Sequence, residues 1–358
     1  MRRSLINPLE RTESFLILRK GDEPLMFFNK KVIGLMMSVA TAATLSACGT
    51  TSAAGHGTST KKQYTIAFIN GDNIDPYFLT AWHGAYAEAQ RLGVKLIENA
   101  PPTFDYEQQA PLIEDMIARH VNAIILSADS GTALQPELKQ AHSAGIPVII
   151  VNQTEADMNN TPYALSFICT SNTELSKYGA KAMHSLIGNS GTTAVINSSA
   201  GLTSDIHRGT GYYAWMKTHA PGIKTLPMQF DLDSRSKADA IATDIIKAHP
   251  HIKGIFAVDS FTGQGVGTAI KALGDKGKIK VVAIDAEPQE VSLMKQGIIQ
   301  ELIAQQPYNM GALSMKYAVD AITGHKSLIK RNVAPSPIIV TPQNLSQMSK
   351  VVYQTWHP

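Results

Sequence analysis

The sequence predicts an α/β fold made of two doubly wound lobes, each a parallel sheet covered by helices on both faces. Short apolar runs alternate with amphipathic segments of helical length from residue 64 onward. The runs are continuously apolar, which is typical of parallel strands buried on both faces. About ten such runs occur, more than one compact sheet usually holds, so two sheets are the simplest arrangement.

The strand–helix alternation continues through the whole folded region. The first unit is a strand at 64–70, a polar turn and a helix at 79–92. Further strands are expected at 94–98, 123–127, 148–152 and 164–168, with helices at 107–119, 131–144 and 172–186. The second half predicts strands at 193–197, 224–230, 254–258, 281–285 and 298–305, with helices at 203–219, 236–249, 263–273, 288–296 and 308–323.

The charge of the folded region argues against a nucleic-acid partner. The 358-residue chain has a formal net charge of +3. Residues 1–47 hold seven of the 32 Lys and Arg and four of the 29 Asp and Glu, so the remainder is formally neutral. Proteins that bind a phosphate backbone carry clustered positive charge instead. The two cysteines, Cys48 and Cys169, lie in different settings and do not indicate a disulfide-stapled fold.

The beginning of the chain has the layout of an export signal. Residues 26–47 combine a small basic region with an apolar run that is too short for a comfortable membrane span. The run ends in Leu45-Ser46-Ala47-Cys48, which resembles a lipobox, so we expect Cys48 to be lipidated. A plain signal peptide with a chance cysteine is the alternative. Residues 1–25 are an uncertain N-terminal extension that suggests a misassigned start, and residues 48–62 are expected to form a flexible tether.

The turn Asp75-Pro76-Tyr77-Phe78 is the first candidate for a binding site. Ligands of open α/β sheets bind outside the carboxyl ends of the strands, where such turns lie. A carboxylate beside two aromatic faces suits a hydroxylated ring. The alternative is that Tyr77 and Phe78 only pack at the start of the helix.

Polar residues also follow later strands. Asn152, Asp259 and Asp285 lie at or just past the carboxyl ends of predicted strands. Each one alone is equally typical of a helix cap or a turn. Together they favour a polar pocket.

The sequence contains no recognisable catalytic or metal-binding motif. The run Gly263-Gln264-Gly265-Val266-Gly267 has the wrong glycine spacing for a dinucleotide fingerprint, and close helix packing explains it better. His249-Pro250-His251 is not a metal spacing. Nucleophile elbows and H-E-x-x-H motifs are absent from the sequence. We therefore expect no enzyme activity, no cofactor and no metal.

Six short motifs together carry a family resemblance. They are Asp75-Pro76-Tyr77-Phe78, Ala144-Gly145-Ile146-Pro147-Val148, Arg208-Gly209-Thr210-Gly211-Tyr212, Ile255-Phe256-Ala257-Val258-Asp259, Val281-Val282-Ala283-Ile284-Asp285 and Ala304-Gln305-Gln306-Pro307. Each is short, but their order and spacing are specific at family level. From residue 64 to about residue 345, the chain resembles a periplasmic sugar-binding protein of the ribose-binding type, a type I solute-binding protein of ABC importers.

The resemblance implies the type I periplasmic binding protein fold, in which a hinge of three crossings joins two lobes that close on one small ligand. The crossings are expected near Thr170, Gln306 and Asn332. The N-terminal lobe would then hold residues 63–169 and 307–332. The C-terminal lobe would hold residues 170–306 and 333–345, followed by a tail at 346–358.

The resemblance also implies which residues bind the ligand. Aromatic rings of the first turn stack on the sugar, and this role falls on Tyr77 and Phe78. The polar positions of the family fall on Asp75, Asn152, Gln153, Arg208, Asp259, Asp285 and Gln305. Three acids against a single arginine suit a neutral polyol or pentose, or a cation, better than a phosphate or carboxylate ligand.

Some positions depart from the family pattern. Asp75 and Asp259 stand where relatives often have Asn, and Asn152-Gln153 stands where many have Asp-Arg. An aromatic residue expected near Leu232 is missing. Trp82 is a candidate to replace it, with core packing as its other role.

The resemblance implies a lipid-anchored, monomeric solute-binding protein on the periplasmic or cell-surface side of a bacterial membrane. It would bind a monosaccharide or polyol in the interlobe cleft and deliver it to an ABC permease. The same fold suits a sensor subunit for a chemoreceptor or histidine kinase, or a binder of a non-sugar polar ligand. A transcription regulator would need a basic helix-turn-helix in place of the export signal.

Overall fold

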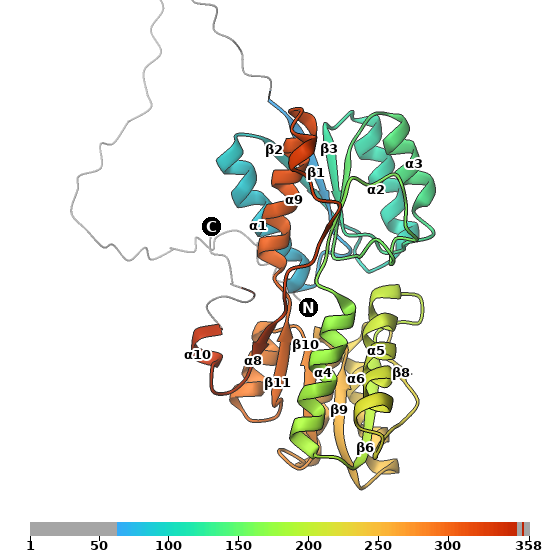
Figure 1. The fold of residues 1–358 in the computed structure, drawn as a ribbon, viewed down its shortest axis with the longest axis vertical. Coiled ribbons are helices and arrows are strands. Elements are labelled where there is room, and N and C mark those ends of the chain that lie inside the picture. Colours follow the sequence, from blue (N-terminus) through green and yellow to red (C-terminus); the bar gives the residue numbers. More distant parts are fainter. Residues whose placement is uncertain (1–62, 349–352, 354–358) are drawn as a thin grey trace, which may run out of the picture. The chain divides into compact units, whose positions relative to one another are not determined.

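The structure is a computed structural model that describes residues 63–348 and Tyr353. The predicted N-terminal extension, the signal sequence, the lipidation site at Cys48 and the tether lie outside the described residues. Within the described part of the chain, no helix combines the length and the apolar character needed to cross a membrane. The described elements form two sheets with helices on both faces, which confirms the predicted fold class (Figure 1).

The first sheet is entirely parallel. Across the sheet its strands lie in the order β12 (Asn332–Val333), β5 (Ser166–Ile168), β4 (Val148–Val151), β3 (Ala123–Leu126), β1 (Thr65–Ile69) and β2 (Lys95–Asn99). Its helices are α1 (Pro76–Leu92), α2 (Tyr106–Ala118), α3 (Gln135–Ser143) and α9 (Pro307–Ile322). Helices α1 and α9 cover one face and α2 and α3 the other (Figure 1). A short 3-10 turn, Lys326–Leu328, follows α9.

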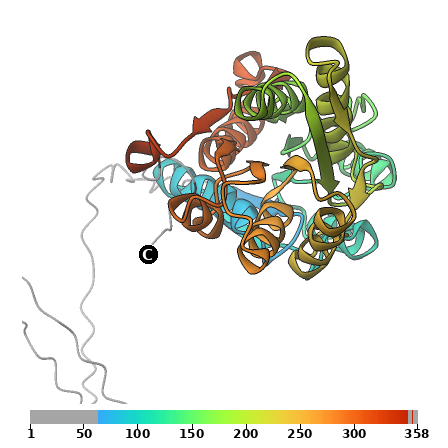
Figure 2. The same ribbon diagram turned by 90° about the horizontal axis from the view of Figure 1, so that it is seen from below.

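The second sheet is parallel apart from its last strand. Its order is β13 (Ile338–Val340), β11 (Glu301–Ala304), β10 (Lys280–Ile284), β9 (Ile252–Ala257), β6 (Gly191–Asn197) and β7 (Ile223–Thr225), with β8 (Gln229–Phe230) also beside β6. Strand β13 is antiparallel to β11. The helices are α4 (Asn172–Ile187), α5 (Thr203–His219), α6 (Arg235–Ala248), α7 (Ser260–Leu273) and α8 (Pro288–Lys295), and α10 (Leu345–Met348) follows β13. Figure 2 views this lobe from its end, with helices around the strands.

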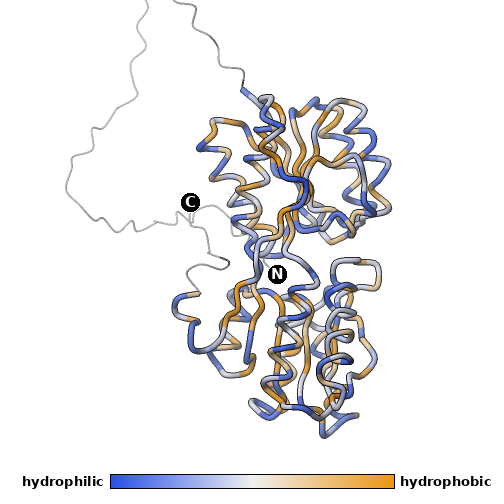
Figure 3. Tube along the Cα trace, in the orientation of Figure 1, coloured by the Kyte–Doolittle hydropathy of each residue, from blue (hydrophilic) through white to orange (hydrophobic). Residues whose placement is uncertain are grey.

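The apolar strands form the core of each lobe. In β1, Ile66 and Phe68 contact the apolar cluster under α1 and α9, whereas Ala67 and Ile69 contact the cluster under α2 and α3. Both sets are buried because the strand has helices on both sides. Figure 3 colours the Cα trace by hydropathy, and the hydrophobic segments are concentrated in the strands. The strands are continuously apolar in sequence because both of their faces are buried under helices.

The chain passes between the sheets three times. It leaves the first sheet between β5 and α4, returns between β11 and α9, and leaves again between β12 and β13. The third crossing begins one residue later than predicted, because Val333 is still in the first sheet. The Val333 carbonyl accepts a hydrogen bond from the Cys169 amide at 3.0 Å.

Some predicted boundaries are wrong. The strand expected at 224–230 is divided into β7 and β8. Pro227 lies between them, and proline has no N–H to continue a ladder of hydrogen bonds. The expected helix at 131–144 begins only at Gln135 in α3, and the short strands β12 and β13 were not predicted.

The glycine run in α7 is explained by close packing. A Cβ atom built on Gly265 would lie 2.4 Å from the Ala238 Cβ and 2.4 Å from the Arg235 carbonyl oxygen, both in α6. Such distances leave no room for a side chain. The run allows α6 and α7 to approach each other and gives no support to a dinucleotide site.

Candidate functional site

A cavity of about 630 Å³ lies where loops at the carboxyl ends of both sheets meet. This volume falls within the range of small-molecule sites, about 300–1,000 Å³. Residues of the first lobe lining it are Asp75, Tyr77, Phe78, Phe104, Asp105, Tyr106, Asp129, Ser130, Thr132, Ala133 and Asn152. Residues of the second lobe are Ser198, Ser199, Gly201, Leu202, Ser204, Asp205, Arg208, Leu232, Asp233, Asp259, Asp285 and Gln305.

Asp75 both starts α1 and lines the cavity. Its carboxylate accepts a hydrogen bond from the Tyr77 amide at 2.8 Å, and Pro76 occupies the first helical position. Aspartate followed by proline is a favourable helix start, because the acid satisfies a free amide and proline needs none. This local chemistry fixes where the next two side chains lie.

Aromatic rings of the first lobe lie together at the cavity. Tyr77 and Phe78 meet edge to face with centroids 5.4 Å apart, and Phe78 stacks on Phe104 at 6.0 Å. Tyr77 and Phe78 also belong to the core cluster, so they both pack in the core and line the cavity. Phe104 was not predicted, because it precedes α2 in a loop with no strand end to mark it.

Asn152 and Asp285 have left-handed backbones at the ends of β4 and β10. Their φ angles are 72° and 81°, a conformation that is uncommon outside glycine and is best tolerated by Asn and Asp. The Tyr77 hydroxyl donates to Asn152 Oδ1 at 2.7 Å, and the Gln305 amide donates to Asp285 Oδ1 at 2.9 Å. Strained residues of this kind concentrate at binding and active sites.

Among the described residues, Arg208 is the one cationic residue that lines the cavity. Its guanidinium forms a buried ion pair with Asp205 at 2.9 Å and donates to the Val258 carbonyl at 3.2 Å. Burial alone would lower the pKa of Arg208, but Asp205 and Asp285 outweigh this effect and raise it. The arginine is therefore a permanently charged donor held in one position.

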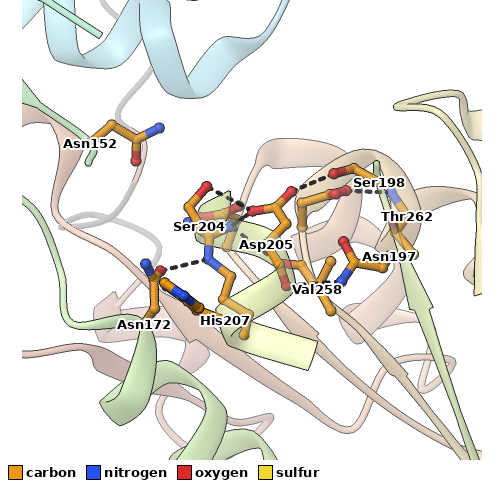
Figure 4. Close-up of polar contacts among 12 residues, drawn as sticks. Asn152, Asn172, Asn197, Ser198, Ser204, Asp205, His207, Val258 and Thr262 are labelled. Carbon is orange, nitrogen blue, oxygen red and sulfur yellow. Dashed lines mark hydrogen bonds and ion pairs between the residues drawn. The ribbon is translucent and has the colours of Figure 1, made fainter. Parts of the chain in front are cut away.

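Asp205 was not predicted as a site residue, although it lies three positions before Arg208 on α5. Ser198 Oγ donates to its carboxylate at 2.5 Å, and Figure 4 shows Asp205 between Ser198 and Ser204. The sequence did carry a signal for Asp205: an acidic and a basic residue three positions apart on one helix can form an ion pair.

The cavity is rich in carboxyl groups whose pKa values are raised. Burial is the first cause in each case: it raises the pKa of Asp129 to about 9 and that of Asp233 to about 7, and holds the pKa of Asp259 well above its usual range. Some of these groups are therefore protonated at neutral pH. Such a group can donate as well as accept, which matches hydroxyl groups.

Three buried side-chain oxygens at the cavity have no partner in the described part of the chain. They are Asp129 Oδ1, Asp259 Oδ2 and Gln305 Oε1. Buried polar atoms nearly always have hydrogen-bond partners in folded proteins. The cavity therefore offers unpaired polar oxygens to a ligand with several hydroxyl groups: Gln305 Oε1 accepts, and a protonated carboxyl group can also donate.

Eight of the nine residues predicted as ligand-binding line the cavity, and Gln153 does not. Its carboxamide oxygen accepts from the Ala128 amide at 2.9 Å, next to the end of β3. Gln153 therefore holds the chain that follows β3, whereas its neighbour Asn152 lines the cavity. Trp82 is also absent from the lining and instead packs beside Tyr86. The suggestion that Trp82 replaces a missing aromatic is therefore wrong.

Polar contacts join the two lobes around the cavity. Asp157 of the first lobe pairs with His207 of α5 at 2.8 Å and accepts from Asn172 at 3.0 Å. The carboxyl groups of Asp75 and Glu287 also share a hydrogen bond across the lobes. Burial, followed by their proximity to each other, raises the pKa of Asp75. The two lobes are thus in contact through pairs of polar side chains that lie far apart in the sequence.

Comparisons with known proteins agree with this arrangement. The family profile described as a periplasmic binding protein domain matches residues 66–326. The chain is 27% identical over 303 residues to the D-allose-binding periplasmic protein of Escherichia coli, covering 83% of this chain and 91% of that protein. It is 23% identical over 267 residues to the ribose import binding protein of Bacillus subtilis, covering 74% and 84%.

Solved structures give the same result. An ABC transporter solute-binding protein from Agrobacterium vitis bound with α-D-tagatopyranose is 28% identical, with a TM-score of 0.77 over 82% of this chain and 100% of that one. A solute-binding protein from Agrobacterium radiobacter in complex with D-arabinose is 28% identical, with a TM-score of 0.76 over 82% and 100%. The resemblance drawn from the sequence motifs is confirmed: this chain belongs to the periplasmic binding protein family.

Proposed function

We propose that this chain binds a neutral monosaccharide or polyol in the cavity between its lobes and delivers it to the permease of an ABC importer. The observation that carries the proposal is the composition of the cavity lining. Aromatic faces come from the first lobe, and unpaired polar oxygens come from both lobes. A sugar has an apolar ring face and a rim of hydroxyl donors, so it satisfies both features at once.

The relatives support the sugar class. The two curated proteins described above are named for allose and ribose, and the two solved structures hold tagatose and arabinose. A cavity of about 630 Å³ has room for a ligand of that size. Arg208 is already neutralised by Asp205, so the described lining residues offer no free positive charge to a phosphate or carboxylate group.

Transport proteins of this architecture work by hinge closure, and the lining supports that mechanism here. Residues of both lobes face the same cavity, and only three chain crossings connect the sheets. A ligand that touches both lobes binds the closed state better than the open one and shifts the population towards it. Closure also removes water from the polar groups, which strengthens their hydrogen bonds.

Each lining residue has a role in this proposal. Tyr77 and Phe78 supply ring contacts. Arg208 donates to ring or hydroxyl oxygens, a role that suits its planar set of donors. The side chains of Asp75, Asn152, Asp259, Asp285 and Gln305 form hydrogen bonds with ligand hydroxyls.

The proposed location is outside the cytoplasm, as the family name implies, with a lipid on Cys48. The basic and apolar segment before Leu45-Ser46-Ala47-Cys48 supports this anchor. Labelled fatty acid should be incorporated by the wild-type chain in bacterial cells and lost in Cys48→Ser. Equal labelling of both chains would exclude Cys48 as the lipidation site.

A thermal-shift screen against pentoses, hexoses, polyols and the corresponding sugar phosphates tests the ligand class. A neutral sugar or polyol should raise the melting temperature, because a ligand that binds only the folded state stabilises it by mass action. Stabilisation by phosphorylated sugars alone would contradict the proposal.

A further inference from the structure

Tyr353 is a buried residue from the segment that the sequence predicted to be an external tail. It lies beyond α10 and beyond the matched family region, which ends at residue 326. Only 5% of its surface is exposed. Its hydroxyl donates to Asp285 Oδ1 at 2.6 Å, so Tyr353 reaches a residue that lines the cavity.

Asp285 receives two donors on the same oxygen. Besides the Tyr353 hydroxyl, the Gln305 amide donates to Oδ1 at 2.9 Å. Gln305 itself lines the cavity, whereas Tyr353 lies behind it. Two hydrogen bonds to Oδ1 fix the rotation of the carboxylate and leave Oδ2 for another partner. The left-handed backbone of Asp285, with φ of 81°, makes such support necessary, since strained residues persist only where their surroundings hold them.

The ring of Tyr353 contacts the other lobe. Its centroid lies 6.2 Å from that of Tyr77, with the planes tilted by 48°. Tyr77 belongs to α1 of the first lobe, whereas Asp285 follows β10 of the second. One tyrosine therefore supports the ring contact of one lobe and the carboxylate of the other.

The protonation of Tyr353 agrees with this role. Burial raises the pKa of Tyr353 well above its usual range, and the nearby charge of Asp285 raises it further. The phenol therefore remains a donor at all physiological pH values.

We propose that Tyr353 is a positioning residue of the binding site, which holds Asp285 and Tyr77 in the geometry that receives the ligand. This inference rests on the proposed function. It assigns a role in ligand affinity to a part of the chain that the family match does not cover. It also makes Tyr353 a contact shared by both lobes.

Tyr353→Phe tests the hydroxyl separately from the ring. A hydrogen bond to a charged group contributes enough that its loss should weaken sugar binding by about 10- to 100-fold. Affinity is measured by isothermal titration of the full-length chain with the monosaccharide that stabilises the wild type most. Tyr213→Phe is the matched control, because Tyr213 donates to the Leu226 carbonyl at 2.5 Å away from the cavity lining. The control should bind the sugar as the wild type does.

A double-mutant cycle with Asp285→Asn separates positioning from a general effect on folding. If Tyr353 acts through Asp285, Tyr353→Phe should have little further effect on affinity in the Asp285→Asn background. A chain ending at Met348 should lose at least as much affinity as Tyr353→Phe. Wild-type affinity in Tyr353→Phe or in the shortened chain, or full additivity in the cycle, would overturn the inference. If the wild type bound no sugar at all, the proposed function itself would fail, and the inference with it.

Discussion

At the scale of single residues, the ion pair of Arg208 and Asp205 connects ligand recognition with stability. Both side chains are buried, and the pair is 2.9 Å long. Removing one member of such a pair leaves an uncompensated charge inside the protein. The residue that is expected to contact the ligand is therefore also a structural residue.

We expect Arg208→Ala to lower the free energy of unfolding of the ligand-free protein by about 3 kcal/mol or more, because Asp205 loses its partner. Urea denaturation measures this change. The paired change Asp205→Asn with Arg208→Met should cost less, since no charge is then left unpaired. Equal stability of the Arg208→Ala variant and the wild type would contradict the buried pair.

Asp129 gives the protein a pH dependence with a definite sign. Its pKa is about 9 in the folded protein and 3.8 in its unperturbed form. Between these values the folded state binds more protons than the unfolded state, so the free energy of unfolding falls as the pH rises. Asp129→Asn is a neutral substitute of the same shape and should remove this part of the slope.

The melting temperatures of the wild type and Asp129→Asn should therefore diverge with pH. At pH 8 we expect the variant to melt higher by about 3 °C or more, given that 1 kcal/mol corresponds to about 2–4 °C for a domain of 150–250 residues. Near pH 4 the two curves should converge. Parallel curves over the whole range would show that Asp129 is ionised in the folded protein.

The sequence predicts site residues well where they follow strands. Parallel strands bring their carboxyl ends to one edge, so residues such as Asn152 and Asp285 converge regardless of their separation in the chain. Asp129 lies just past the end of β3 and carries the same signal, although it was not predicted. Phe104 and Tyr353 could not be found this way, because one lies in a loop and the other after the last helix. Their positions depend on tertiary contacts that have no local pattern.

At the scale of elements, α1 and α9 pack unusually closely because each has a glycine at the contact. A Cβ atom on Gly84 would lie 1.9 Å from the Tyr308 carbonyl oxygen, and one on Gly311 would lie 1.8 Å from the Ala81 carbonyl oxygen. The contact joins the helix that begins at the binding site to the helix that follows the second crossing. It therefore fixes the position of Tyr77 relative to the hinge.

Gly84→Ala and Gly311→Ala should each destabilise the protein by about 1–3 kcal/mol through overpacking, despite the higher helix propensity of alanine. Gln90→Ala on the exposed side of α1 is the control and should change stability by less than about 0.5 kcal/mol. Chemical denaturation of the three variants measures these effects. A stabilising Gly84→Ala would contradict the close approach of the helices.

The predicted elements agree with the structure where the pattern is long and periodic. The helix at 203–219 has the same bounds in α5. Short elements such as β12 and β13 were missed, since two or three residues give no recognisable period. These strands form because they pair with the edge strands of sheets that are built by other parts of the chain.

At the scale of the whole described chain, contacts between the lobes bias the closed arrangement. Asp157 and His207 lie 50 positions apart in the sequence and meet at 2.8 Å across the cleft. A contact present only when the lobes meet adds to the population of the binding-competent state. No sequence pattern connects these two residues, so the contact could not be predicted.

His207→Ala should weaken sugar affinity by about two- to fivefold, the loss expected for one half-exposed polar pair. The melting temperature of the ligand-free protein should change little, because His207 is half exposed. Isothermal titration provides the affinity. Unchanged affinity would mean that this contact does not favour closure.

The central claim is that the cavity between the lobes takes one neutral sugar or polyol. It is tested most directly by titrating the full-length chain, in a calorimeter, with the sugar that stabilises it most and with the phosphate ester of that sugar. The account predicts one site per chain for the free sugar and much weaker binding of the ester. Tight binding of the ester with no heat from the free sugar would contradict it.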